Sequence, residues 1–251
     1  MVKGLDTFRR YFAEYADCYV LIGGSACDVN FSVAALPFRV THDLDLVLCV
    51  EALTPQFFAR FWSFIREGGY EHREKSNGER QFYYRFTHPT RFDYPAMLEL
   101  FARKADVLPV DVTGHLTPIP AGEEASSLSG ILLNDLYYDF VMANRTEIEG
   151  VSVVSPVGLM ALKAIAWLDL TKKKEEGDVH AYSKDIGKHK NDIARLAVLT
   201  AGLEPEIPDG IRTVMADFMS RYQSEPLDTM ALRLPLGEAE VKSEIRRLFG
   251  V

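Results

Sequence analysis

Two short stretches near the start of the sequence decide which fold is expected. The chain reads YVLIGGSA from Tyr19 to Ala26 and RVTHDLDLVLCV from Arg39 to Val50. The apolar run before the two glycines is typical of a buried strand. The glycines then end that strand with backbone that tolerates positive φ and lets a ligand approach closely. Ser25 is a residue type that caps helices, so this stretch predicts a strand, a turn and a helix whose first N–H groups can hold an anion.

The second stretch places two carboxylates on one face of a strand. Asp43 and Asp45 are two residues apart within an apolar run that predicts a strand from Phe38 to Val50, and residues at that spacing share a face. Neighbouring carboxylates repel each other, and Mg²⁺ usually takes one or two carboxylates together with substrate phosphates. Together the two stretches favour a site for Mg²⁺ or Mn²⁺ and a polyphosphate. The alternatives are an ordinary glycine turn and a solvated strand face that carries two acids.

These motifs resemble those of a known family. The GGS turn at residues 23–25, followed by DLDL at residues 43–46, resembles the nucleotidyltransferase superfamily that has the polymerase-β-like catalytic core. The RxTxDLD motif at residues 39–45 is similar to that of the group that includes the AbiEii-type abortive-infection toxins. The resemblance implies that the acidic pair binds two metal ions. It also implies that the triphosphate of an NTP is held by Gly23, Gly24 and Ser25.

The resemblance further implies a third carboxylate on a strand beside the acidic pair. Glu99 lies within the apolar run from Ala96 to Phe101, where an acid is rarely buried unless it is paired or bound to metal. We expect Glu99 in this role, both as a catalytic residue and as a metal ligand. Asp93 and Asp106 are its rivals, although each stands at the edge of an expected strand, where an ordinary solvated acid is the simpler interpretation.

The character of the sequence changes at Ser155-Pro156, which reads as an N-cap followed by proline at the first helical position. Apolar residues then recur at helical spacing toward the C-terminus. We therefore expect an α/β (α+β) nucleotidyltransferase domain at residues 1–154, with a mixed sheet flanked by helices. A helical C-terminal domain is expected at residues 155–251, with the nucleotide in the cleft between the two domains.

Further nucleotide contacts are expected in the helical part. In the family a lysine on the equivalent helix faces the triphosphate, and Lys163 is the residue that matches it. The alternative is a lysine that snorkels at the edge of the core. The run around Lys190 and Asp192 resembles the last motif of the family, although Asn191 stands where an acid is commoner. Here the alternative is a solvated charged face.

Composition limits the remaining possibilities. The 251 residues are 47% hydrophobic and 25% charged, as in ordinary soluble globular proteins. The net charge of −8 argues against tight non-specific binding of nucleic acid. No apolar run is long enough to span a membrane and no signal peptide is recognisable, so we expect a cytoplasmic protein without a membrane partner. Cys18, Cys27 and Cys49 have no Cys-x-x-Cys spacing and are expected to be buried thiols.

The expected function is therefore metal-dependent transfer of an NMP from an NTP to a hydroxyl group. The resemblance leaves the acceptor open: the 3′ end of an RNA such as tRNA, a protein side chain or a small molecule. A toxin role would add a cognate antitoxin as a partner. The alternative is a non-catalytic nucleotide-binding or interaction protein that has the same fold.

The periodicity also predicts individual elements elsewhere. Helices are expected at residues 5–15, from the GGS turn to Leu36, and from Thr54-Pro55 to Gly68-Gly69. Strands are expected at residues 81–87, 136–142 and 149–154.

Overall fold

The computed structural model describes residues 2–71, 83–102, 134–179 and 181–251, and in this part the chain forms a six-stranded mixed sheet and eight α-helices. The expected mixed α/β class is confirmed. The chain divides into two compact units: Met1–Tyr138 with Arg145–Val154, and Asp139–Asn144 with Ser155–Val251. The second unit thus resumes at Ser155, where the sequence changes character, and it also takes in the end of a preceding helix.

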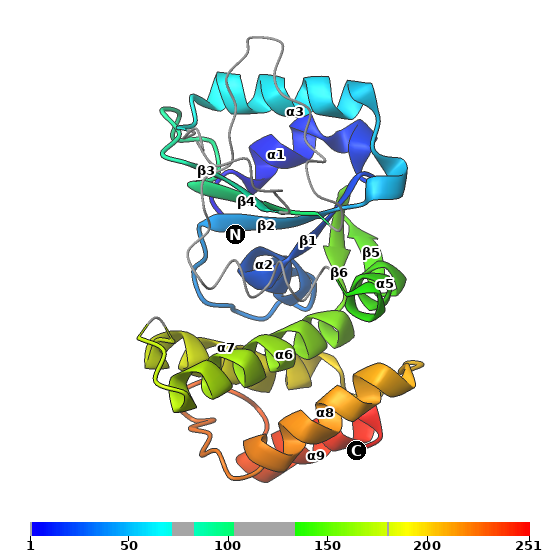
Figure 1. Cartoon of the computed structure of the whole chain (residues 1–251), viewed down its shortest axis with the longest axis vertical. Helices are drawn as coiled ribbons and strands as arrows, with labels where there is room; N and C mark the ends of the chain where they lie inside the picture. The colour runs from blue at the N-terminus through cyan, green and yellow to red at the C-terminus, as the bar shows by residue number, and fades with distance from the viewer. Residues whose placement is uncertain (1, 72–82, 103–133, 180) are drawn as a thin grey trace. The chain divides into compact units, whose positions relative to one another are not determined.

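All six strands belong to the first unit, and their order across the sheet is β3-β4-β2-β1-β6-β5 (Figure 1). The strands are β1 (Tyr19–Ile22), β2 (Asp43–Leu48), β3 (Tyr83–Thr87), β4 (Met97–Phe101), β5 (Arg145–Ile148) and β6 (Val151–Val154). β2 is parallel to β4 and β1 is parallel to β6, whereas the other neighbours are antiparallel. The strand predicted at residues 81–87 therefore runs antiparallel to β4, and β4 is the parallel neighbour of β2.

Helices cover both faces of this sheet (Figure 1). On one face lie α1 (Leu5–Tyr11) and α3 (Pro55–Gly68), and on the other lies α2 (Gly23–Val33). The α1 and α3 side is built from aromatic rings, and several pairs meet edge to face. The ring centroids of Phe8 and Tyr19 are 5.1 Å apart, and those of Phe61 and Phe86 are 5.4 Å apart. Such pairs add to the large apolar area that each ring buries. This face is therefore core, and the opposite face of β2 carries Asp43 and Asp45.

Two predicted helix starts are confirmed with their caps. The Thr54 Oγ1 atom accepts a hydrogen bond from the backbone N–H of Phe57 at 3.1 Å, and Ser155 Oγ accepts one from Gly158 N–H at 3.4 Å. In both helices proline follows the cap, where its missing N–H costs nothing. Helix α3 also ends as predicted, because Gly69 takes the left-handed conformation with φ of 63°.

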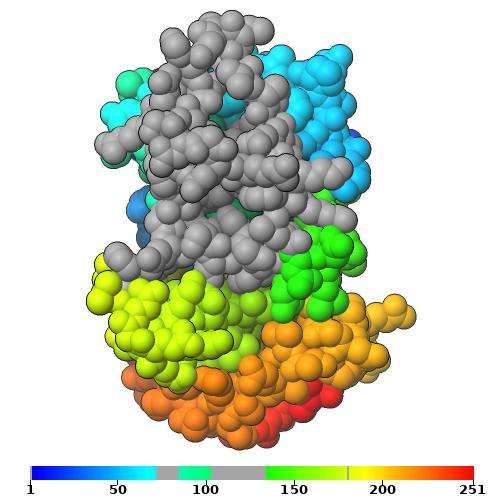
Figure 2. All heavy atoms as spheres, in the orientation of Figure 1, coloured from blue at the N-terminus to red at the C-terminus, as the bar shows by residue number. Residues whose placement is uncertain are grey.

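The second unit is helical in all its described regular elements after Ser155. Its α-helices are α6 (Pro156–Glu175), α7 (Ser183–Leu196), α8 (Asp209–Tyr222) and α9 (Glu238–Phe249). Helix α6 packs against α7 and α8, and the indole of Trp167 lies edge-on to the ring of Phe218 at 5.4 Å. In Figure 2 the yellow-green atoms of this unit directly adjoin its orange atoms. No described helix is long and apolar enough to cross a membrane.

The predicted strand at residues 136–142 is wrong, because this segment is the helix α5 (Asp135–Ala143). Its aromatic and β-branched residues are typical of strands. However, the side chain of Asn134 accepts a hydrogen bond from Leu136 N–H at 2.9 Å and so starts a helix. Tyr138 and Val141, three residues apart, are then both buried. Tertiary packing on one helical face has overridden the strand propensity.

Four other predicted elements extend beyond the observed bounds. Helix α1 ends at Tyr11 rather than at residue 15. Strand β2 begins at Asp43 rather than Phe38, and α2 ends at Val33 rather than Leu36. The strand expected from residue 149 begins at Val151, because Glu149 and Gly150 both have positive φ (49° and 76°). Those two residues form the tight turn of the β5–β6 hairpin, which needs positive φ at both positions. Asp106, the other rival of Glu99, lies outside the described residues. So do Asn77-Gly78, a pair that predicts a hairpin turn, and residues 114–130, for which the sequence predicts loops.

The three cysteines give a prediction about reactivity. All three are buried and free of disulfides, and burial raises the pKa of the Cys18 thiol to about 12 and also raises the pKa of Cys49. Because the thiolate is the nucleophile, iodoacetamide at neutral pH is expected to label the native protein very slowly. The same protein in urea should take up three labels. Rapid labelling of the native protein would contradict this burial.

Candidate functional site

The GGS turn lies directly against the second acid of β2. Ile22, the last residue of β1, is in register with Asp45 of β2, and α2 begins at the next residue, Gly23. A Cβ added to Gly23 would lie 1.9 Å from Oδ2 of Asp45, and the φ of Gly23 is 64°. Both the close approach and the backbone conformation therefore require glycine. The first turn of α2 and the Asp45 carboxylate form one contiguous feature.

The second glycine lies against a cation and a hydroxyl group. A Cβ on Gly24 would lie 2.9 Å from Thr41 Oγ1 and 3.3 Å from Arg39 Nη2. The start of α2 is thus flanked by Asp45 on one side and by Arg39 and Thr41 on the other. The sequence motif contained Arg39 and Thr41, but no role was assigned to them. Their spacing was the available signal, since positions 39, 41, 43 and 45 share one face of an extended segment.

Ser25 does not cap α2 as predicted. The helix starts at Gly23, with Ile22 as the residue before it, and no side chain caps this end. Ser25 Oγ instead donates a hydrogen bond to the carbonyl oxygen of Ile22 at 3.2 Å, and its side chain is fully buried. The glycines allow the helix to begin three residues earlier than it would with Ser25 as the cap.

The structure brings the predicted third carboxylate beside the acidic pair. Glu99 of β4 is in register with Asp45 of the parallel strand β2, and Asp43 lies two residues earlier on the same face. Neighbouring strands are about 4.8 Å apart, and in-register residues point to the same side. Asp45 and Glu99 are therefore side-by-side carboxylates. The rival Asp93 lies outside the strands, and there it forms an exposed ion pair with Arg91 at 3.0 Å.

Glu99 has a cationic neighbour on its other side. Arg85 of β3 is in register with Glu99, and its Nε and Nη2 atoms both donate to Oε1 of Glu99, at 2.7 and 2.6 Å. The sequence indicated only that Arg85 alternates with the aromatic face of its strand. Register, which the pattern of one strand does not give, brings Arg85 to Glu99.

These residues fit a divalent ion in part. Carboxylates are the hard oxygen ligands that Mg²⁺ and Mn²⁺ prefer, and Asp43 and Asp45 share one strand face. Among the described residues, however, no group of three His, Cys, Asp or Glu side chains is arranged to hold a metal ion. One Glu99 oxygen is in contact with Arg85 instead. A site made by Asp43, Asp45 and substrate phosphates fits this chain, and Glu99 lies beside it with its Oε1 atom held by Arg85.

Lys163 and Asp192, predicted separately as nucleotide contacts, form an ion pair with each other in the second unit. Lys163 Nζ lies 2.9 Å from Asp192 Oδ2, with Lys163 5% exposed and Asp192 0% exposed. Arg195 adds a second cation, 3.4 Å from Asp192 Oδ1. Lys163 is therefore not a snorkelling lysine, and Asp192 is not on a solvated face. The snorkelling alternative is wrong for Lys163, and Asp192 is buried with it as a pair, whereas Lys184 and Lys188 of the same helix as Asp192 are exposed.

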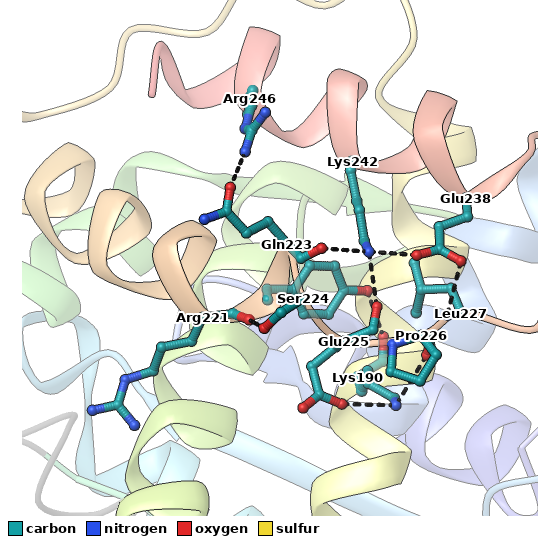
Figure 3. Close-up of polar contacts among 11 residues, drawn as sticks. Lys190, Arg221, Gln223, Ser224, Glu225, Pro226, Leu227, Glu238, Lys242 and Arg246 are labelled. Atoms are coloured by element: carbon teal, nitrogen blue, oxygen red, sulfur yellow. Dashed lines mark hydrogen bonds and ion pairs between the residues drawn. The ribbon is translucent and has the colours of Figure 1, made fainter.

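Lys190 has different partners in the same unit (Figure 3). Its Nζ atom donates to Glu225 Oε2 at 3.0 Å and to the carbonyl oxygen of Pro226 at 3.1 Å. Nearby, Lys242 Nζ donates to the carbonyl oxygens of Gln223 and Glu225, at 2.9 and 2.8 Å. The two lysines thus bind the turn that follows α8, as basic side chains commonly do beyond a helix C-terminus. These contacts hold that turn together, and none of them joins Lys190 to the Lys163–Asp192 pair.

Comparison with known proteins gives no match: no protein-family model, no curated protein and no solved structure resembles the chain detectably.

The contact between Gly23 and Asp45 gives a second prediction, tested by Gly23→Ala. Gly150 is a matched control, since its φ is also positive (76°) but a Cβ there would have no atom within 4 Å. Gly150→Ala should lower the free energy of unfolding by about 1 kcal/mol, for the left-handed backbone alone. Gly23→Ala should cost roughly 1–3 kcal/mol more because of the clash with Asp45. Urea unfolding measures both, and the excess should shrink in an Asp45→Ala background. Equal costs would contradict the close contact.

A third prediction concerns the buried ion pair. Lys163→Met should lower the free energy of unfolding by about 3 kcal/mol, because it leaves the Asp192 carboxylate buried without its main partner. Adding Asp192→Leu should recover most of that loss. The control is Lys172→Met on the same helix, where an exposed pair with Glu176 at 3.9 Å should be worth under about 0.5 kcal/mol. If Lys163→Met proved no worse than this control, the pair would be solvated rather than buried.

Proposed function

We propose that this chain is a metal-dependent nucleotidyltransferase that moves an NMP from an NTP to a hydroxyl acceptor. One observation carries the proposal: Asp45 lies in register with Glu99 and directly against Gly23, where α2 begins. The start of a helix offers unpaired N–H groups and a positive dipole end to phosphates. Carboxylates offer ligands to a cation. A polyphosphate and a divalent ion are usually bound together, and here the two kinds of group are adjacent.

The residues divide the work according to their chemistry. The N–H groups of the first turn of α2, together with Arg39 and Thr41, would bind phosphate oxygens, since guanidinium groups form strong charge-assisted hydrogen bonds with them. Asp43 and Asp45 would hold Mg²⁺ or Mn²⁺. The bound ion would lower the pKa of the acceptor hydroxyl and balance the charge of the leaving group. Ser25 is buried against Ile22 and would support the turn.

The transfer itself is an in-line displacement. The acceptor oxygen attacks the α-phosphorus of the NTP, the bond from that phosphorus to the bridging oxygen breaks, and pyrophosphate leaves. Glu99 would help to activate the acceptor hydroxyl by taking up its proton, as a base adjacent to the metal-bound carboxylates. The acceptor remains a prediction: an RNA 3′ end such as that of tRNA, a protein hydroxyl or a small molecule. A toxin role with a cognate antitoxin belongs to the same prediction.

A non-catalytic nucleotide-binding protein is the second candidate, and one observation favours it. The ion pair between Arg85 and Glu99 neutralises the carboxylate that would act as the base. A protein that keeps this pair at all times would still bind a metal–nucleotide complex through Asp43, Asp45 and the start of α2, but it would not transfer the nucleotide.

A fourth prediction tests the proposed function. Wild-type protein incubated with labelled NTPs, Mg²⁺ and total RNA or lysate should transfer label to an acceptor. Asp45→Asn keeps the side-chain shape and should reduce transfer by about 10³-fold or more, since the ion supplies several kcal/mol and each 1.36 kcal/mol is tenfold in rate. Asp93 is a partly exposed acid outside the strands, so Asp93→Asn is the control and should retain full activity.

The outcomes separate the two candidates. Full activity in a folded Asp45→Asn protein would refute metal-dependent transfer at this site. Nucleotide binding by the wild type that depends on Asp45, with no labelled acceptor under any condition, would favour the non-catalytic protein.

A further inference from the structure

Three charged side chains form a row across three neighbouring strands. The register aligns Arg85 of β3 with Glu99 of β4, and Glu99 with Asp45 of β2. The row then ends against the backbone of Gly23, where α2 starts. From β3 toward α2, the order is therefore a cation, two carboxylates and the N-terminal end of a helix. The two carboxylates are the inner members of this row.

The contact between Arg85 and Glu99 is unlike an exposed surface pair. Two nitrogen atoms of one guanidinium group reach the same carboxylate oxygen, at 2.7 and 2.6 Å. The side chains are 27% and 12% exposed, so water screens the pair only partly. The orientation of Glu99 is thus set by a partner on β3. This strand flanks β4 on the side away from β2.

Electrostatics explains why a cation is needed at this position. Carboxylates on adjacent strands repel each other. The positive end of α2 lies on the Asp45 side, and Arg85 lies on the Glu99 side. In the absence of a divalent ion, Arg85 offsets the charge of Glu99 in this row, and Arg39 is a second cation near the start of α2. A divalent ion bound at Asp43 and Asp45 would supply the same compensation.

We propose that Arg85 is the internal counter-ion of the carboxylate site. Arg85 balances the negative charge of Glu99 until a bound divalent ion does so. The proposal rests on the proposed function, since it concerns the same metal site. Arg85 is a positioning residue that acts through Glu99, and it competes with the metal for the negative charge of the row. Arg85 therefore stabilises the metal-free protein and weakens metal binding through the same interaction, and the two free-energy changes are linked.

The test is a titration with Mn²⁺ alone, followed by electron paramagnetic resonance of the free ion, on the full chain without nucleotide. Arg85→Gln should bind Mn²⁺ roughly five- to tenfold more tightly than the wild type, because the Glu99 carboxylate, released from the guanidinium group, can then attract the ion. Arg85→Lys keeps the charge and should remain close to the wild type. Arg91→Gln is the matched control, since Arg91 pairs with Asp93 outside the strands, and it should change nothing.

Thermal melting gives a second readout on the same proteins. Metal-free Arg85→Gln should melt at a lower temperature than the wild type, and saturating Mn²⁺ should raise its melting temperature by more than it raises that of the wild type. If Arg85→Gln is unfolded without metal, Mn²⁺ should restore folding. A variant that stays unfolded at saturating Mn²⁺ would overturn the proposal, because the metal would then not replace the lost charge.

A double-mutant cycle shows whether Arg85 acts through Glu99. In a Glu99→Gln background, Arg85→Gln should leave Mn²⁺ affinity nearly unchanged, whereas independent effects would add. Equal Mn²⁺ affinity in folded Arg85→Gln and wild type would overturn the counter-ion role. The transfer reaction would then still be tested separately by Asp45→Asn. Absence of Mn²⁺ binding by the wild type, with or without NTP, would overturn the metal-dependent function itself.

Discussion

The first unit depends on one close contact, between the backbone of Gly23 and the carboxylate of Asp45. At Gly23, β1 ends and α2 starts. The backbone there lies so close to the Asp45 carboxylate that a Cβ atom has no room. That constraint fixes where β1 ends, where α2 begins and how β1 aligns with β2, because Ile22 pairs with Asp45. The alternation along β2 then places leucines toward the aromatic layer of α1 and α3 and acids toward α2. The candidate site and the aromatic layer thus lie on opposite faces of the same strand.

Local chemistry made part of the fold predictable. Thr54-Pro55 and Ser155-Pro156 gave the starts of α3 and α6, because a cap and a proline act within one turn of helix and need no distant partner. Helix α5 was mistaken for a strand, since its composition of aromatic and β-branched residues is shared by both kinds of element. Its cap and its buried face depend on packing that periodicity over nine residues does not resolve.

The candidate site was predictable to the same extent. The pair of acids and the glycine turn follow from spacing along one strand, and the family resemblance suggested Glu99. Arg85 was missed because its importance comes from the register between β3 and β4, a property of two strands together. Lys163 and Asp192 were recognised as notable charges, but their mutual pairing joins helices α6 and α7. Sequence shows which charges are unusual, and tertiary structure decides what they face.

The position of β1 within the sheet has a consequence for how the chain folds during synthesis. β1 lies between β2, which follows it closely, and β6, which is the last of the described strands to leave the ribosome. Until β6 pairs with Leu21, β1 is an exposed edge made of Val20, Leu21 and Ile22. Such an apolar edge is open to pairing with other chains, and contacts between distant segments form slowly. A nascent chain that has not yet reached Val154 therefore has every residue of the candidate site but carries an unprotected edge at the centre of its future sheet.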